Sequence, residues 1–267
     1  MGFFHLTILA IIQGLTEFLP ISSSGHLILI SKLFLVENNL QFDISVHLGS
    51  LIAVMIYFKN DIKSLSLGLR DSFNLRFNTA NSKFLRYIIF ATIPVIFFGF
   101  LVKYTGLIND LRSILIIGLS SIIFGILLLV SDKFGKNNKK LLDLNLKDSI
   151  IIGLGQSISL IPGSSRSGTT ITFARLLGYS RINSSKISMI MSIPTILASG
   201  ILLINDLIFL NYNFINITKL LYSSLLSFIV AYLCLILFFF YIKRYNFTIF
   251  VLYRCILGIL ILSLILI

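Results

Sequence analysis

Long apolar runs separated by short polar segments dominate the chain. Six of these runs are uninterrupted and long enough to form helices that cross a bilayer, whose hydrocarbon core of about 30 Å needs roughly 20 residues. They lie at about 44–58, 87–102, 113–130, 187–204, 220–242 and 248–267. The pattern predicts an all-α polytopic membrane protein with about six full transmembrane helices.

Two further apolar stretches, at about 3–30 and 149–178, are each interrupted midway. The first contains PISSSG from Pro20, and the second contains PGSSRSG from Pro162. Proline and glycine break helices. We therefore interpret both stretches as re-entrant helical hairpins.

The two breaks resemble each other, which indicates an internal repeat. A second matched pair follows in IPVIFFG at Pro94 and IPTILASG at Pro194. Broken apolar segments in corresponding positions of two halves are typical of inverted-repeat membrane folds with a site near mid-depth. We predict one membrane domain over 1–267, with repeat halves at roughly 1–130 and 149–267.

Composition agrees with this class. Apolar residues make up 57% of the chain and charged residues 12%, whereas a soluble domain has about 25% charged residues. The net charge of +12 would suggest nucleic acid as a partner for a soluble chain. Because the basic residues lie in the loops between apolar runs, we expect membrane orientation, not nucleic-acid binding, to explain them.

The loops fall into two groups by charge. One group carries 16 lysine and arginine residues and the other carries 4. Cytoplasmic loops collect basic residues, so we expect the first group to be cytoplasmic. The groups are 59–86, 131–148, 175–186 and 243–247, against 31–43, 103–112 and 205–219. The six spans alternate consistently only if the two hairpins enter from opposite faces.

Glu17 is the only acidic residue deep inside an apolar stretch. Gln13 precedes it by four residues, so the two side chains share one helix face. Their oxygen atoms suit a hard divalent cation such as Mg²⁺ or Ca²⁺, which completes its shell with water and phosphate. The alternative is a buried carboxylate that accepts hydrogen bonds from backbone N–H groups of the broken helix.

The second break surrounds Arg166 with hydroxyl groups in SSRSGTT. Hydroxyls, backbone amides and a restarting helix around one guanidinium are typical of an anion site, because the planar guanidinium matches two phosphate oxygens. The alternative is that the hydroxyls only cap two half-helices while Arg166 extends to the membrane surface. If the two hairpin tips meet at mid-depth, Glu17 and Arg166 should share one phosphate-sized space.

The first break offers three hydroxyls followed by His26, in SSSGH. A serine near a histidine can be a nucleophile activated by a general base, although so short a pattern also occurs by chance. Two other polar residues received structural interpretations. We expect His47 to form an interfacial hydrogen bond with Asp43, the alternative being that the two form a pair that supports the site residues. We expect Arg254 to extend to lipid phosphate.

The motifs QGLTEFLPISSSGH (13–26) and PGSSRSGTT (162–170) resemble those of the undecaprenyl-diphosphate phosphatase family, also called bacitracin-resistance proteins. The resemblance extends over essentially the whole chain, through FDISVHLGS at 42–50 and the segment 242–254. It implies a multi-pass enzyme of the bacterial plasma (inner) membrane with its active site facing the periplasmic side. Such an enzyme hydrolyses undecaprenyl diphosphate to the monophosphate and inorganic phosphate, recycles the lipid carrier for peptidoglycan synthesis, and confers bacitracin resistance.

The resemblance also implies a divalent-metal requirement and site residues at matching positions. Two positions depart from the expected pattern: Gln13 stands where many members carry glutamate, and His47 where glutamine is expected. The residues that match are Glu17, Ser23, His26, Ser165, Arg166 and Thr170.

These observations give one hypothesis about roles. Glu17, with Gln13, holds the metal or orients the nucleophile, His26 is a general acid or base, and Ser23 is the nucleophile. Direct attack by a metal-activated water remains an open alternative to Ser23. The expected phosphate-binding residues are Ser22, Ser24, Ser165, Arg166, Ser167 and Thr170.

Two further questions stay open from the residues alone. Inverted repeats with broken helices are more typical of carriers, so a flippase or transporter of a prenyl phosphate is the alternative function. The sequence also leaves open whether the chain acts alone or as a homodimer.

Overall fold

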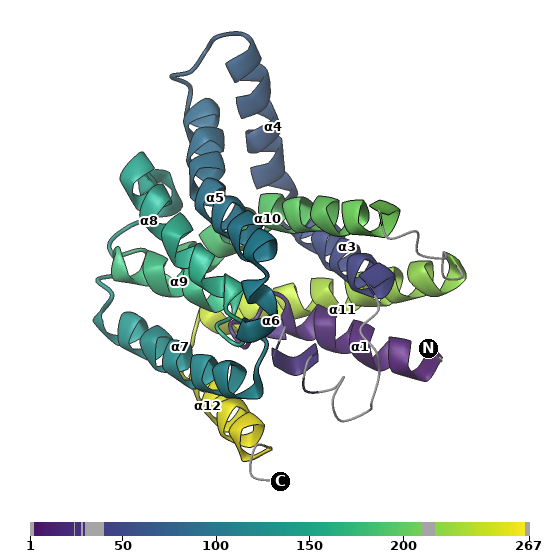
Figure 1. Cartoon of the computed structure of the whole chain (residues 1–267). Coiled ribbons are helices and arrows are strands. Elements are labelled where there is room, and N and C mark those ends of the chain that lie inside the picture. The colour runs from purple at the N-terminus through teal and green to yellow at the C-terminus, as the bar shows by residue number, and fades with distance from the viewer. Residues whose placement is uncertain (1–2, 24, 28, 30–39, 210–216, 265–267) are drawn as a thin grey trace.

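The computed structural model describes residues 3–23, 25–27, 29, 40–209 and 217–264, and this part of the chain is helical apart from its connections and one isolated bridge. Figure 1 shows the arrangement. The labelled helices are α1 (Phe3–Thr16), α3 (Leu40–Tyr57), α4 (Lys59–Phe73), α5 (Ala80–Thr105), α6 (Leu107–Leu111), α7 (Ile114–Phe134), η1 (Leu141–Asp143), α8 (Leu146–Ser157), η2 (Ile158–Leu160), α9 (Arg166–Leu176), α10 (Arg181–Phe209), α11 (Ile217–Ile242) and α12 (Thr248–Ser263).

Four helices of the described part are long and apolar enough to cross a membrane: α5, α7, α10 and α11. The predicted span at 44–58 corresponds to α3, which is followed by α4 at an angle of 88°. The predicted last span corresponds to the shorter apolar helix α12. The prediction of an all-helical chain with several apolar spans is confirmed, whereas the number six and the two re-entrant hairpins stay predictions.

Both sequence breaks are turns between helices, and both are built in the same way. Ser22 (φ 75°) and Ser165 (φ 69°) have left-handed backbone conformations, which are uncommon for residues other than glycine. Each serine hydroxyl accepts a hydrogen bond from the backbone N–H three residues later, from Gly25 at 3.3 Å and from Gly168 at 3.1 Å. Ser-x-Ser-Gly is therefore the shared local motif, and it starts a helix in both places.

The helix contacts are also paired. Helix α1, which leads into the first break, packs against α11, and α8, which leads into the second, packs against α5. Figure 1 shows α1 reaching the middle of the molecule from the N-terminal side, whereas α8 and α9 come from the opposite side. This pairing makes α11, not α10, the counterpart of α5. Because Pro94 lies in α5 and Pro194 in α10, the contacts do not support our matching of these two prolines.

Helices α3 and α11 pack closely because α3 has a glycine at the contact. A Cβ atom added to Gly49 would overlap the carbonyl oxygen of Ser224 and lie 3.0 Å from the backbone nitrogen of Phe228. Small residues at helix contacts are typical of membrane proteins, where backbones can then approach each other.

We expect Gly49→Ala to destabilise the protein by about 1–3 kcal/mol, because the atoms of Ser224 and Phe228 that the new Cβ would approach belong to the backbone and cannot easily move aside. Gly200→Ala is the matched control, since a Cβ there meets no atom within 4 Å. Thermal unfolding in detergent measures both variants. Equal stability of the two variants would contradict the close α3–α11 packing.

Candidate active site

A polar pocket of about 190 Å³ lies where the two breaks meet. This volume is below the roughly 300–1,000 Å³ of pockets for drug-sized ligands, so it suits a headgroup and not a whole lipid. Nine of its ten lining residues are polar or charged. They come from the first break, α3, η2, the start of α9, and α10: Glu17, Ser22, Ser23, His47, Ser159, Ser165, Arg166, Thr195, Ile196 and Ser199.

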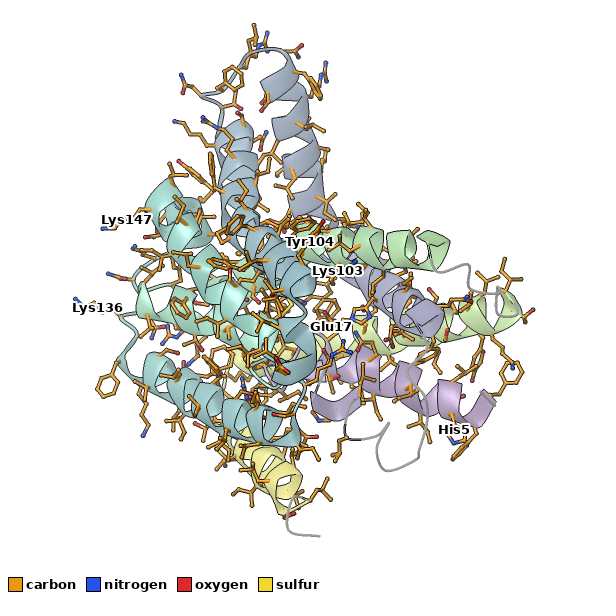
Figure 2. The ribbon with its side chains drawn as sticks, viewed as in Figure 1. His5, Glu17, Lys103, Tyr104, Lys136 and Lys147 are labelled. Carbon is orange, nitrogen blue, oxygen red and sulfur yellow. The ribbon has the colours of Figure 1, made fainter. Side chains whose placement is uncertain are left out.

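Glu17 lines this pocket and is buried, near the middle of the molecule (Figure 2). Its Oε2 atom accepts hydrogen bonds from Gln13 Nε2 at 2.7 Å and from Ser23 Oγ at 3.1 Å. Its Oε1 atom accepts one from Arg166 Nη2 at 3.0 Å, in an ion pair across the two breaks. The expectation that Glu17 and Arg166 share one space agrees with these distances. Within the described part of the chain, side chains and not backbone N–H groups donate to this carboxylate.

Ser23 and Arg166 occupy equivalent positions in the two breaks. Each directly follows the serine with positive φ, in SSSG and SRSG respectively. From these positions they reach opposite oxygens of the same carboxylate. The shared backbone motif therefore delivers a hydroxyl from one break and a guanidinium from the other to Glu17.

Arg166 retains an unused donor. Its Nη1 atom is buried and has no hydrogen-bond partner among the described residues. A buried donor without an acceptor costs about 1–3 kcal/mol, so an anion that supplied the acceptor would be stabilised here. Arginine pairs well with phosphate because two N–H groups can reach two oxygens. This geometry favours the anion site over an Arg166 that extends to the membrane surface.

The other predicted phosphate ligands divide into two groups. Ser22 and Ser165 line the pocket, although both hydroxyls also cap helices. Ser167 and Thr170 do not line it: Ser167 donates to the carbonyl of Leu19 at 2.8 Å, and Thr170 donates to the carbonyl of Arg166. Ser24 lies outside the described residues.

His26 is directed away from the carboxylate. Its Nδ1 atom lies 2.7 Å from the carbonyl oxygen of Ser22, and its Nε2 atom lies 2.6 Å from the hydroxyl of Tyr253. The His26 and Tyr253 rings also stack, with centroids 5.5 Å apart. Both ring nitrogens are therefore engaged by groups other than the Glu17 carboxylate, His26 does not line the pocket, and its catalytic role stays a prediction.

The interpretation of Arg254 is wrong. Its side chain is fully buried and does not extend to lipid phosphate. The guanidinium donates to the carbonyl of Pro20 (3.5 Å) in the first break, and to those of Gly163 (3.0 Å) and Ser164 (2.8 Å) in the second. A fourth bond reaches the carbonyl of Ser121 on α7 (3.2 Å). Arg254 therefore joins the two breaks behind the pocket.

Sequence reasoning favoured an interfacial role for His47 and missed the polar residues of α10. His47 Nε2 lies 3.9 Å from Glu17 Oε2, and His47 Nδ1 lies 2.7 Å from the backbone carbonyl of Asp43. The expected hydrogen bond thus involves the Asp43 backbone, while the ring faces the pocket. Thr195, from IPTILASG, lines the pocket and accepts a hydrogen bond from Gln156 Nε2 at 3.1 Å. A polar residue inside an apolar run was the available clue in both cases.

The residues present fit a divalent cation only if the ligand completes its shell. Glu17 supplies the carboxylate, and Gln13 Oε1 is buried without a partner among the described residues. The described part of the chain has no cluster of three or more histidine, cysteine, aspartate or glutamate side chains. An ion that prefers oxygen and takes several ligands from phosphate is compatible with this set.

Comparison with known proteins gives a consistent result. The family model described as bacitracin resistance protein BacA matches residues 6–260. The undecaprenyl-diphosphatase of Jannaschia sp. (strain CCS1) is 43% identical, with 98% of each chain covered. Those of Alteromonas mediterranea and Ruegeria pomeroyi are 44% and 42% identical, with 97% and 98% of each chain covered.

Proposed function

The chain belongs to the bacitracin resistance protein BacA family, and on this premise we propose that it hydrolyses undecaprenyl diphosphate to undecaprenyl phosphate and inorganic phosphate. The relatives named above are undecaprenyl-diphosphatases at 42–44% identity over nearly their full length. In the cell this reaction would return the lipid carrier to peptidoglycan synthesis and confer bacitracin resistance.

The contact between Glu17 and Arg166 is the observation that carries this proposal. Glu17 and Arg166 are 149 residues apart in the sequence, yet the two breaks place their carboxylate and guanidinium 3.0 Å apart in a polar pocket. Phosphoryl transfer depends mainly on positioning and on neutralising charge, and this pocket offers both. The pocket volume suits the diphosphate, so the prenyl tail would lie in lipid or between helices.

Arg166 holds the terminal phosphate in this mechanism. Its Nη2 atom is fixed by Glu17, which leaves Nη1 free to donate to a phosphate oxygen. Ser165 offers a hydroxyl at the edge of the same pocket. As charge develops on the phosphate oxygens, a donor already in place stabilises the transition state more than the ground state.

Ser23 is the nucleophile that the geometry favours. Its hydroxyl donates to Glu17 Oε2, so Glu17 is placed to accept the proton when Oγ attacks the terminal phosphorus. The bridging P–O bond breaks, undecaprenyl phosphate leaves, and water then releases phosphate from the serine. Direct attack by water, with Glu17 accepting its proton, is the alternative. Acid quenching during turnover followed by mass analysis for phosphorylated Ser23 separates the two routes.

A divalent cation such as Mg²⁺ or Ca²⁺, bound by Glu17 and Gln13 together with the diphosphate, would neutralise charge on the phosphate oxygens. Gln13 Oε1, which has no partner among the described residues, and the Glu17 carboxylate support this assignment.

The proposed placement is a multi-pass protein of the plasma (inner) membrane with six spans, two oppositely inserted hairpins and a pocket open to the outer face. The unequal charge of the loops and the paired contacts of α1 with α11 and α8 with α5 support it. The same pairing keeps a prenyl-phosphate flippase as the second candidate function, because inverted repeats are common among carriers.

The direct test is phosphate release by the purified chain from a C55 prenyl diphosphate in detergent, with and without EDTA. We expect release without chelator and its loss with EDTA, restored by added Mg²⁺ or Ca²⁺. Phosphate release that EDTA does not change would refute the proposed role of a divalent cation. Liposomes in which labelled prenyl phosphate changes leaflet without any phosphate release from the diphosphate would instead favour the flippase.

A further inference from the structure

We propose that His47 is a protein ligand of the divalent cation in this pocket, which makes the site a mixed nitrogen and oxygen site that prefers Mn²⁺ or a similar transition-metal ion over Mg²⁺ and Ca²⁺. This inference rests on the proposed cation at Glu17 and Gln13. It assigns a role to a side chain that the mechanism above leaves unused.

The hydrogen bond on the far side of the His47 ring fixes its tautomer. The Nδ1 atom lies 2.7 Å from the backbone carbonyl oxygen of Asp43, and a carbonyl oxygen can only accept. Nδ1 therefore carries the hydrogen of the neutral ring, and Nε2 presents its lone pair to the pocket. Histidine ligands usually hold their other N–H on a backbone carbonyl or a carboxylate in this manner.

The distance between His47 and Glu17 suits a shared ion better than a direct hydrogen bond. Nε2 and Oε2 lie 3.9 Å apart, beyond the range of a hydrogen bond. Metal–nitrogen and metal–oxygen bonds of about 2.0–2.2 Å each would bring both atoms onto one ion without a large movement of either side chain. The His47 side chain is 29% exposed and that of Glu17 is 6% exposed, so an ion can enter from the His47 side.

Oε2 is the oxygen of Glu17 that pairs with His47, and an ion bound to it would take the place of at least one of the donors that it now accepts from, Gln13 Nε2 and Ser23 Oγ. Arg166 is bound to Oε1, on the other edge of the carboxylate. Gln13 lies one helical turn before Glu17, and its Oε1 atom is a buried acceptor without a partner among the described residues. His47 and Glu17 thus supply one nitrogen and one oxygen, Gln13 would add its amide oxygen if Oε1 and Nε2 exchanged places, and the diphosphate would supply the rest.

This donor set determines the preferred ion. Carboxylate, amide and phosphate oxygens alone suit Mg²⁺ or Ca²⁺, whereas an imidazole nitrogen favours first-row transition metals. A mixed set that includes phosphate suits Mn²⁺, which also accepts oxygen ligands readily.

The test is pulsed electron paramagnetic resonance of Mn²⁺ bound to the purified chain in detergent, with and without methylene diphosphonate as a diphosphate that cannot be cleaved. In the wild type, we expect a directly bound ¹⁴N nucleus to modulate the electron spin echo of Mn²⁺. In His47→Gln, we expect this ¹⁴N modulation to be lost. We also expect the dissociation constant for Mn²⁺ to rise at least about 10–100-fold in His47→Gln, the range known for weaker perturbations of metal sites. His5→Gln is the matched control, because it removes an imidazole from α1 outside the pocket and should change neither result.

Absence of ¹⁴N modulation in the wild type under both conditions would overturn the assignment, as would modulation that persists in His47→Gln. Either result combined with phosphate release from the C55 diphosphate would leave the proposed phosphatase intact and remove only His47. The opposite combination, ¹⁴N modulation lost in His47→Gln without any phosphate release, would support the His47 ligand and refute the phosphatase.

Discussion

Arg166→Ala is expected to lower phosphate release from a C55 prenyl diphosphate by at least about a hundredfold, the scale of losing one preorganised donor in a buried site. The guanidinium is the strongest anion-binding group in the pocket, and its Nη1 atom has no hydrogen-bond partner among the described residues. Phosphate release under saturating substrate is the measurement, with size-exclusion chromatography to show that the variant stays folded.

Glu17→Gln should cause a loss of similar size, because it removes both the proton acceptor for Ser23 and the charge that positions Arg166. The double variant should be little worse than either single one, since residues that act as a unit are not additive. Arg70→Ala, an exposed arginine of α4, is the matched control and should retain normal turnover. Near-normal turnover in Arg166→Ala or Glu17→Gln would remove that residue from the mechanism.

Arg254→Ala should cause the largest loss of stability. The substitution leaves four backbone carbonyls without the donor that now reaches them. The carbonyl of Ser121 keeps its partner within α7, so three carbonyls are left unsatisfied. Each costs about 1–3 kcal/mol, and the summed loss is therefore comparable with the total stability of about 5–15 kcal/mol that is typical of proteins. The measurement is the temperature at which half of the detergent-solubilised protein leaves the monodisperse peak in size-exclusion chromatography.

Two other arginine variants test this interpretation of Arg254. Arg254→Lys should recover part of the stability, because an ammonium group retains three donors but cannot span both breaks. Arg244→Ala removes an exposed arginine whose guanidinium lies over the Phe240 ring, and it should unfold at nearly the wild-type temperature. Wild-type stability of Arg254→Ala would show that the bridge between the breaks is not needed.

The helices and the meeting of the two breaks could be predicted because they depend on features that can be read from the sequence. Apolar runs of helix length predict helices, and Pro20 and Pro162 mark where two of them end. A charged residue beside each break, Glu17 and Arg166, then indicates where buried charges must find partners. The bend between α3 and α4 was not predicted, although it separates an apolar helix from a charged one.

The directions of single side chains could not be predicted. His26 follows the polar break SSSG and lies nearer to Glu17 in the sequence, yet it contacts Tyr253 on α12, while His47, on α3, faces Glu17. Which way each ring points depends on the rotation of its helix against partners more than 170 residues away in α11 or α12. Arg254 was misinterpreted for the same reason, because its acceptors are backbone carbonyls that composition and spacing do not reveal.

The bonds that connect the two breaks restrict how the molecule can move. Ser167 donates to the carbonyl of Leu19, and Arg254 bonds to Pro20 on one side and to Gly163 and Ser164 on the other. A rocking motion that drew one half away from the other would have to break the bonds of Ser167 to Leu19 and of Arg254 to Pro20, whereas the bonds of Arg254 to Gly163 and Ser164 lie within the second half. If the chain also carries lipid across the bilayer, both turns must travel together as one rigid unit, and access must change at the surrounding helices instead.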